Sequence, residues 1–184
     1  MAHIDTAPIE EAYFKRLLHE TDPREAICRL AERWGVRESS TEPWLGLSQP
    51  EHQVTMVLIY VGEVGNGGHT QFFSNRGGEV ALRVRAAARE IDLVELDIVL
   101  GDAFAVFPNG QPPADRAEVD RLPDSWGDDR AAEFARLDRR VWRLDPYPAL
   151  IAYLRSHEQE VLRSERGLAE SPPVDPLSAR TARS

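Results

Sequence analysis

The sequence predicts an all-α protein, built as a single compact multi-helix domain of about six to eight helices. Two observations support this fold class. Helix start signals recur along the chain, and each is followed by apolar residues spaced three and four apart, as on one face of a helix. Apolar residues make up 42% of the 184 positions, which is enough for a substantial core in a chain of this length. We therefore expect helices packed around one core.

Residues 1–47 are expected to form an N-terminal helical extension packed on that core. A first helix is predicted over 9–18, and the next begins at the N-cap Asp22 and should end at Gly35. Its apolar stripe consists of Ile27, Leu30, Ala31 and Trp34. Cys28, the only cysteine, lies beside this stripe, so we expect an inert core position and no disulfide within the chain.

The main helical domain is expected over 48–165. Ser48 and Glu51 have the spacing of a capping box, in which each side chain bonds the backbone N–H of the other residue. The run from Val54 to Val61 is apolar on every face and rich in β-branched residues, so its pattern also fits a buried strand. Its cap and its neighbours favour a buried helix.

Two helices and a short third one follow a glycine-rich segment. The first has an apolar stripe made of Val80, Val84, Ala87 and Ile91. Asp92 is the expected N-cap of the second, with Glu95 as its capping-box acid. A short helix should begin at Pro113, because a bare loop from there to Trp126 would be unusually long.

The C-terminal part is predicted to contain two more helices. One begins at Asp128 or Asp129, and the last carries apolar residues from Leu150 to Val161. Residues 166–184 contain few apolar side chains and two consecutive prolines. We therefore expect a disordered tail there.

The glycine-rich segment, residues 63–78, holds five of the chain's 12 glycines, which indicates positive φ angles or a close backbone approach. We expect Asn66 or Gly67 to end the preceding helix in the left-handed conformation, and Gly67 or Gly68 to have a positive φ. A short turn should then carry Phe72 and Phe73 into the core. Side-chain amides are expected to bond the unpaired backbone groups of this turn, and they belong to Asn66, Gln71 and Asn75.

This segment resembles a domain-of-unknown-function family typified by a bacterial DNA-mimic protein. The family pattern is an acidic residue followed by Asn-Gly-Gly, an aromatic residue, Gln-Phe-Phe and an asparagine with a glycine soon after. The chain matches the pattern at Glu63, Asn66, Gly67, Gly68, Gln71, Phe72, Phe73, Asn75 and Gly78. Similar segments recur at 107–108, 112–116 and 137–140, so the resemblance covers roughly residues 48–160.

Two positions depart from the family pattern. His69 stands where the family usually has an aromatic residue, and Arg76 stands where a small hydroxyl residue is common. Replacement of His69 by phenylalanine should therefore be tolerated. The resemblance implies an all-helical fold and, for the typifying member, a homodimer that binds a transcription factor through a DNA-like acidic surface. It implies no particular partner for this chain.

The net charge of −9 argues against dominant nucleic-acid binding and fits a basic partner. Most of this charge lies in residues 89–133, which contain twelve acids and four bases. Acids three or four residues apart on a helix lie about 5–6 Å apart and can face a basic groove in rows. The expected acidic face consists of Asp92, Glu95, Asp97, Asp102, Asp115, Glu118 and Asp120. A solvated face that keeps the protein soluble is the alternative.

A second charged feature is a stripe of arginines on the helix that begins near Asp128. Its members, at helical spacing, are Arg136, Arg139, Arg140 and Arg143. Such a stripe can contact phosphate, but competent nucleic-acid binding requires further basic area that the chain lacks. Pairing with acids of this chain or of a second copy is therefore the favoured interpretation.

Other kinds of site find little support in the sequence. The glycines of residues 65–68 lack the lysine of a phosphate loop, and the five histidines are scattered without metal-ligand spacing. We expect no catalytic residue, metal or cofactor. No apolar run is long enough for a membrane helix, and the polar start lacks a signal sequence, so we expect a cytoplasmic protein.

The expected function is that of a non-enzymatic acidic protein-binding module. It would act as a DNA mimic that occupies a DNA-binding or other basic protein, without membrane association or direct nucleic-acid binding. The resemblance adds homodimerisation. The alternative is a small-molecule-binding or hydrolytic helical protein, with a pocket near Glu63, His69 and Gln71 for acid–base chemistry.

Overall fold

The computed structural model describes residues 11–38, 47–114, 116–119, 121 and 124–170. Within these ranges the chain forms eight α-helices and no strand, which confirms the all-α prediction. The helices are α1 (Glu11–Leu18), α2 (Pro23–Glu38), α3 (Gln49–Glu90), α4 (Val94–Ala105), α5 (Arg116–Val119), α6 (Asp124–Val141), α7 (Tyr147–Ser156) and α8 (Glu158–Glu170). The short helix predicted to begin at Pro113 is found as α5, which begins later, at Arg116, and the helix predicted from Asp128 or Asp129 starts earlier, at Asp124.

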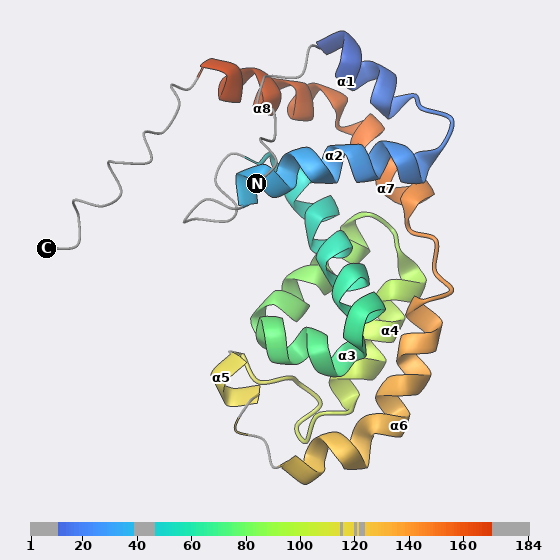
Figure 1. Ribbon diagram of the computed structural model, residues 1–184, viewed down its shortest axis with the longest axis vertical. Helices are drawn as coiled ribbons and strands as arrows, with labels where there is room; N and C mark the ends of the chain where they lie inside the picture. Colours follow the sequence, from blue (N-terminus) through green and yellow to red (C-terminus); the bar gives the residue numbers. More distant parts are fainter. Residues whose placement is uncertain (1–10, 39–46, 115, 120, 122–123, 171–184) are drawn as a thin grey trace, which may run out of the picture.

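Helix α3 lies at the centre of the fold and packs against α4, α5 and α6 as well as α2, α7 and α8. Its 42 residues do not form one straight rod. The backbone leaves the helical conformation at Gly67, Gly68 and Gly77, and the ribbon changes direction along its course (Figure 1). The sequence thus folds one long helical stretch back onto itself, which lets α3 supply several walls of the core.

Aromatic side chains fill the space between α3, α4 and α6. The ring of Phe73 lies edge-on to Phe107, with centroids 4.7 Å apart, and close to Phe72 at 5.2 Å. Phe104 and Phe134 complete this cluster, and all five rings are buried. Burying each ring contributes about 1.5–3 kcal/mol, so this cluster is a major source of stability.

The described part of the expected N-terminal extension packs on the rest of the chain. Phe14 of α1 and Trp34 of α2 are buried in the same core, and α2 lies along α7 (Figure 1). The Arg155 side chain donates to the carbonyl of Leu18, which is the last residue of α1. This contact satisfies a carbonyl that the helix end leaves unpaired. The domain boundaries at residues 47 and 165 stay a prediction.

Two predicted helix starts are confirmed by their hydrogen bonds. The Asp22 carboxylate accepts the backbone N–H of Arg24 at 2.9 Å and of Glu25 at 3.2 Å, at the start of α2. At the start of α3, the Glu51 carboxylate accepts from the Ser48 backbone N–H at 2.7 Å and from its hydroxyl at 2.9 Å. The capping box is complete, and Glu51 is fully buried.

Two expectations for α2 are wrong. The helix does not end at Gly35 but continues to Glu38, because one glycine inside a helix costs only about 1 kcal/mol and the buried face outweighs it. Cys28 is exposed rather than a core residue. It lies one position beyond the buried pair of Ala26 and Ile27, on the solvent side of the stripe.

Asp92 ends α3 instead of starting α4. It has a φ of 64°, and the backbone N–H of Leu93 reaches back to the carbonyl of Ala88 at 2.7 Å. The N–H of Asp92 reaches the carbonyl of Arg89 at 3.2 Å. These two bonds form a Schellman motif, whose left-handed residue is often glycine but can be a short polar residue. The N-cap of α4 is Leu93, which makes no side-chain cap bond.

The predicted last helix is two helices. The chain leaves the α-helical conformation at His157, which has a φ of −113°, and α8 starts at Glu158. The burial of Val161 and Leu162 explains why the apolar pattern continues past this break. Helix α8 also extends to Glu170, so the first residues of the expected disordered tail, 166–170, are helical. The rest of that tail, residues 171–184, lies outside the described residues.

Gly78 provides a test of the packing between α3 and the segment before α5. Its N–H donates to the carbonyl of Pro113 at 2.8 Å, and an added Cβ would lie 2.4 Å from that oxygen. Since backbone atoms on both sides must move, Gly78→Ala should lower the free energy of unfolding by roughly 1–3 kcal/mol. The control is Gly65, an exposed glycine at which an added Cβ would meet no heavy atom within 4 Å.

Gly65→Ala should raise the stability by about 0.5–1 kcal/mol, because alanine is the better helix former. Urea unfolding followed by circular dichroism measures both variants. Equal stability of the two alanine variants would contradict this packing.

Candidate functional site

Gly68 is the residue at which the motif requires glycine. Its φ is 73°, and an added Cβ would lie 2.5 Å from the Asp138 carboxylate. This confirms the expectation of a positive φ at Gly67 or Gly68. The helix-ending role expected for Asn66 or Gly67 is wrong, because Gly67 has a φ of −153° and Asn66 is not at positive φ. Gly68, one position later, has the positive φ, together with an extended ψ of −175° that is almost confined to glycine.

The chain after Gly68 is helical rather than a short turn. Residues 69–76 keep helical φ and ψ angles until Gly77, which has a φ of 71°. This helical stretch places Phe72 and Phe73 on its inner side, where both are buried. The expectation that these rings enter the core is confirmed, although the local structure that carries them is different.

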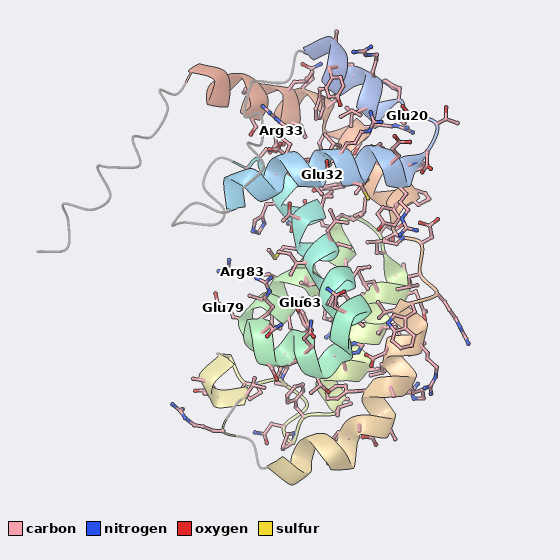
Figure 2. The ribbon with its side chains drawn as sticks, viewed as in Figure 1. Glu20, Glu32, Arg33, Glu63, Glu79 and Arg83 are labelled. Carbon is pink, nitrogen blue, oxygen red and sulfur yellow. The ribbon has the colours of Figure 1, made fainter. Side chains whose placement is uncertain are left out.

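Glu63 collects three side-chain donors of the motif. Its carboxylate accepts from the amides of Gln71 at 3.0 Å and Asn75 at 2.9 Å, and from Arg76 Nε at 2.9 Å. Gly67 makes room for this arrangement, since an added Cβ would lie 2.1 Å from the Gln71 amide oxygen. Figure 2 labels Glu63 on α3.

The two amides therefore bind a carboxylate, not the backbone groups expected from the sequence. Asn66, the third amide of that expectation, is exposed. Arg76 departs from the family pattern but serves as the ion-pair partner of Glu63, whose side chain is only 13% exposed. Burial raises the pKa of the Glu63 carboxyl, but the hydrogen bonds from Gln71, Asn75 and Arg76 outweigh this effect and lower the pKa below its ordinary value.

His69 joins the motif to α6. Its backbone N–H donates to Asp138 Oδ1 at 2.9 Å, and its ring Nδ1 lies 2.5 Å from the same oxygen. The ring Nδ1–H donates to this carboxylate, and Nε2 lies within hydrogen-bond distance of the Tyr60 hydroxyl, at 2.6 Å. Burial, followed by the Asp138 charge, raises the pKa of Tyr60 well above its ordinary value, so this phenol stays a donor.

The surroundings of His69 are aromatic and closed to solvent. The residue is fully buried, and its ring stacks on Phe134 with centroids 5.7 Å apart and an interplanar angle of 6°. The ring thus fills an aromatic site, and it adds two polar bonds. A substrate from solvent cannot reach it, so an acid–base pocket that uses His69 together with Glu63 and Gln71 has no geometric support.

The expectation that phenylalanine can replace His69 is not supported by this geometry. A phenylalanine ring would fill the space and keep the backbone N–H bond to Asp138, but it would remove the ring N–H from Asp138 and leave the buried Tyr60 hydroxyl without its ring partner. Sequence reasoning assigned no role to Asp138 or Tyr60. The Leu-Asp-Arg-Arg segment at 137–140 is one of the segments that resemble the family, and this resemblance is the one feature of the sequence that points to Asp138.

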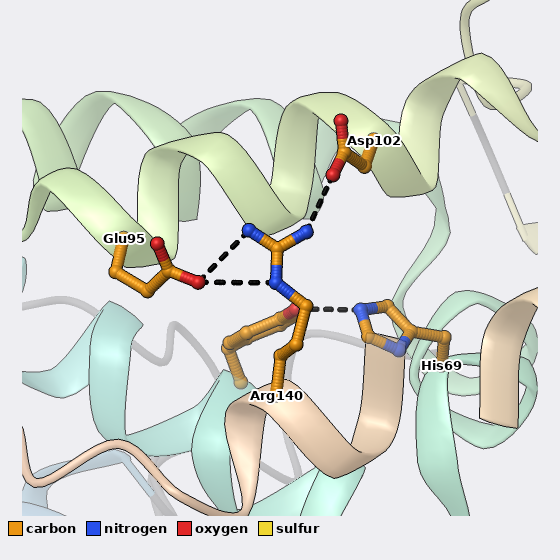
Figure 3. A network of polar contacts seen from close by, with 5 residues as sticks. His69, Glu95, Asp102 and Arg140 are labelled. Atoms are coloured by element: carbon orange, nitrogen blue, oxygen red, sulfur yellow. Dashed lines mark hydrogen bonds and ion pairs between the residues drawn. The ribbon is translucent and has the colours of Figure 1, made fainter. Parts of the chain in front are cut away.

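Three of the expected acidic-face residues on α4 are paired with arginines. Arg140 of α6 donates to Glu95 at 2.8 Å and to Asp102 at 2.6 Å (Figure 3). The hydrogen bond that Arg140 donates to Glu95 is the largest cause that raises the pKa of Arg140. The two carboxylates remain 49% and 45% exposed. They form a surface ion-pair network that fastens α4 to α6.

Asp97 faces the other side of α4. Its carboxylate accepts from Arg85 at 2.6 Å and from Arg89 at 3.0 Å, both on α3. Burial raises the pKa of Asp97, but the two guanidinium groups outweigh it and lower the pKa below its ordinary value. Helix α4 is therefore held on both flanks by charge pairs, and the roles of Arg85 and Arg89 in them were not expected from the sequence.

Two more of the expected acids, Asp92 and Glu118, are among the described residues. Asp92 is exposed at the end of α3, and Glu118 is exposed on α5. Asp115 and Asp120 lie outside the described residues. The face that the sequence predicts thus contains both paired and exposed carboxylates, and its role in protein binding stays a prediction.

The arginine stripe on α6 divides into two parts. Arg140 pairs with acids of this chain, as the favoured interpretation expects. Within the described residues, no carboxylate within 4 Å is recorded for the three exposed members, Arg136, Arg139 and Arg143. Trp142 is 61% exposed beside them, and its indole N–H donates to the carbonyl of Val64 at 3.3 Å.

The described part of the chain holds neither a metal-ligand cluster nor a membrane-spanning helix. No group of three or more histidine, cysteine or acidic side chains among those residues is placed to hold a metal ion. None of the helices there is long and apolar enough to cross a membrane.

The family model described as DMP19-like protein matches residues 45–157, well over half of the chain. The chain belongs to the DMP19-like protein family. The match includes α3 to α7, and therefore the Glu63 motif, the His69–Asp138 contact and the Arg140 pairs. Comparison with curated proteins and with solved structures found no match.

The Glu63 cluster of this DMP19-like chain should make its stability depend on pH. Since the folded state lowers the pKa of Glu63, the stabilisation is complete above the unfolded-state value of about 4.3 and is lost as pH falls through the folded-state pKa. Glu63→Gln should therefore cost roughly 1–3 kcal/mol at pH 7 and progressively less below about pH 4.

Glu79→Gln is the matched control. Glu79 pairs with Arg83 one turn away and is 68% exposed, so its loss should change the free energy of unfolding by less than about 0.5 kcal/mol. Urea titrations at several pH values measure both variants. A Glu63→Gln penalty that is the same at about pH 7 and about pH 3.5 would show that the carboxylate charge does not stabilise the motif.

Proposed function

We propose that this chain is a non-enzymatic protein-binding module that occupies a basic, DNA-binding partner in place of DNA. Membership of the DMP19-like protein family over residues 45–157 is the observation that carries the proposal. The resemblance to a DNA-mimic protein and the net charge of −9 support it. A strongly acidic protein attracts a basic one over distances of about a Debye length and is repelled by nucleic acid.

The ion pairs on α4 are compatible with this role. Glu95 and Asp102 are about half exposed, and exposed pairs of this kind contribute only about 0–1 kcal/mol. A cation from a partner can therefore replace Arg140 at small cost. Asp92 needs no such exchange, since it is exposed and no cation within 4 Å is recorded for it in the described part of the chain.

The absence of catalysis and the assembly state are parts of the same proposal. The closed surroundings of His69 argue against acid–base chemistry at the motif.

The homodimer that the resemblance implies requires one self-complementary surface patch. Trp142, at 61% exposure, is an exposed aromatic residue on which a second copy could pack.

Displacement by DNA tests the proposal. The full chain is immobilised, basic proteins are captured from a cell lysate at low salt, and duplex DNA is added as competitor. A DNA mimic predicts that the retained proteins bind DNA and that duplex DNA releases them. Raising the salt from about 50 to 300 mM should weaken retention by roughly tenfold or more. Retained proteins that duplex DNA does not displace would overturn the proposal.

Two charge-matched variants locate the surface. The test variant combines Asp92→Asn with Glu95→Gln. The control variant combines Glu20→Gln with Glu32→Gln and changes the net charge to the same extent. Figure 2 labels Glu20 and Glu32 at the end of the molecule formed by α1 and α2. Asparagine tolerates the left-handed backbone of Asp92. The first pair should reduce retention by roughly threefold to tenfold and the second should not. Equal effects would mean that only total charge matters.

A further inference from the structure

A small pocket opens where two helix connections meet. It lies between the turn that joins α3 to α4 and the link that joins α6 to α7, and its volume is about 180 Å³. Its apolar walls come from Val61, Leu93, Val94, Leu96, Leu144 and Pro146. Three carboxylates also border it, and they belong to Asp92, Glu95 and Asp145. Neither the Glu63 motif nor the His69 contact involves this pocket.

The carboxylates lie at the outer edge of the pocket. Asp92 and Asp145 are exposed, whereas Val61, Leu93 and Leu144 are partly buried. Within the described residues no cation within 4 Å is recorded for Asp92 or Asp145. The Asp145 carboxylate accepts the backbone N–H of Tyr147 at 3.3 Å. The carboxylates of Asp92 and Asp145 thus give the edge two negative charges, in addition to the Glu95–Arg140 pair.

The edge is also fixed in position. The Schellman motif at the end of α3 holds the backbone of Asp92, and Arg140 holds the side chain of Glu95. Val94, at the first position of α4, is 60% exposed, so the apolar interior is open to a visiting side chain. A pre-formed apolar pocket with fixed charges at its edge binds without a large ordering cost.

We propose that this pocket binds an apolar side chain of a basic peptide segment, while lysine or arginine residues on either side of that side chain pair with Asp92 and Asp145. The inference rests on the proposed function and names the chemistry of the partner at the acidic face. A cation placed inside the pocket would lose its hydration against apolar walls, so the apolar residue enters and the cations stay at the edge. Anionic ligands are repelled by the carboxylates of Asp92 and Asp145.

Short peptides test the two parts of this chemistry separately. The probe has a central leucine between two lysines on each side, and its controls replace the leucine by glycine or the lysines by glutamates. Binding to the full chain is measured by NMR titration. The leucine peptide should bind about tenfold more tightly than the glycine peptide, because one leucine side chain leaves water. The glutamate peptide should not bind.

Two variants on one helix face locate the binding. Val94→Lys adds a cation at the pocket edge, and Ile98→Lys adds the same charge one turn further along α4, at a residue that is 46% exposed and does not line the pocket. Both sites are exposed, so both variants should fold. Val94→Lys should weaken the leucine peptide by about tenfold or more, and Ile98→Lys by no more than about twofold.

The outcomes separate this inference from the proposed function. If the leucine and glycine peptides bind equally, or if the two lysine variants have equal effects, the pocket is not a recognition site, even where duplex DNA still displaces captured proteins. If the pocket binds the leucine peptide as described but duplex DNA displaces nothing, the pocket stands and the DNA-mimic proposal fails.

Discussion

The contact between His69 and Asp138 is the constraint on which the arrangement of this fold depends. One carboxylate oxygen of α6 accepts both the backbone N–H and the ring N–H of a fully buried histidine in α3. Burying a carboxylate is costly unless donors satisfy it. Gly68 must be glycine because a Cβ there would collide with Asp138, so the turn, the histidine and the carboxylate form one unit.

Helix α6 is held on a second side by the same stretch of sequence. Two residues after Asp138, Arg140 reaches across to Glu95 and Asp102 of α4 (Figure 3). The His69–Asp138 contact is buried, whereas the pairs that Arg140 makes with Glu95 and Asp102 are exposed. The buried contact therefore fixes where α6 lies, while the exposed pairs add little stability and leave carboxylates that a partner can reach.

Much of the fold could be predicted from local sequence signals. The capping residues Asp22 and Ser48 and the apolar stripes act within a few positions, so the helices that they start follow from the sequence. The glycine with a positive φ could be narrowed to Gly67 or Gly68 but not to Gly68 alone, because the deciding neighbour is Asp138, 70 positions away. Asp92 illustrates the same limit, since one short polar residue can end a helix or begin one.

The site was harder to predict because its partners are distant in sequence. The carboxylates of α4 have helical spacing, which says where they point along one helix but not which arginines face them. Arg85, Arg89 and Arg140 come from two other helices, and only the packing of α3 and α6 brings them together. Charge counted along the chain therefore overstates the charge that α4 offers to a partner.

A double-mutant cycle on His69 and Asp138 tests the central claim most directly. The free energy of unfolding is measured for the parent, His69→Phe, Asp138→Ala and the double variant. If the pair holds α6 on α3, each single change should cost roughly 2–4 kcal/mol, and the coupling energy should be about 1–3 kcal/mol. A His69→Phe variant as stable as the parent, or a coupling energy near zero, would contradict this account.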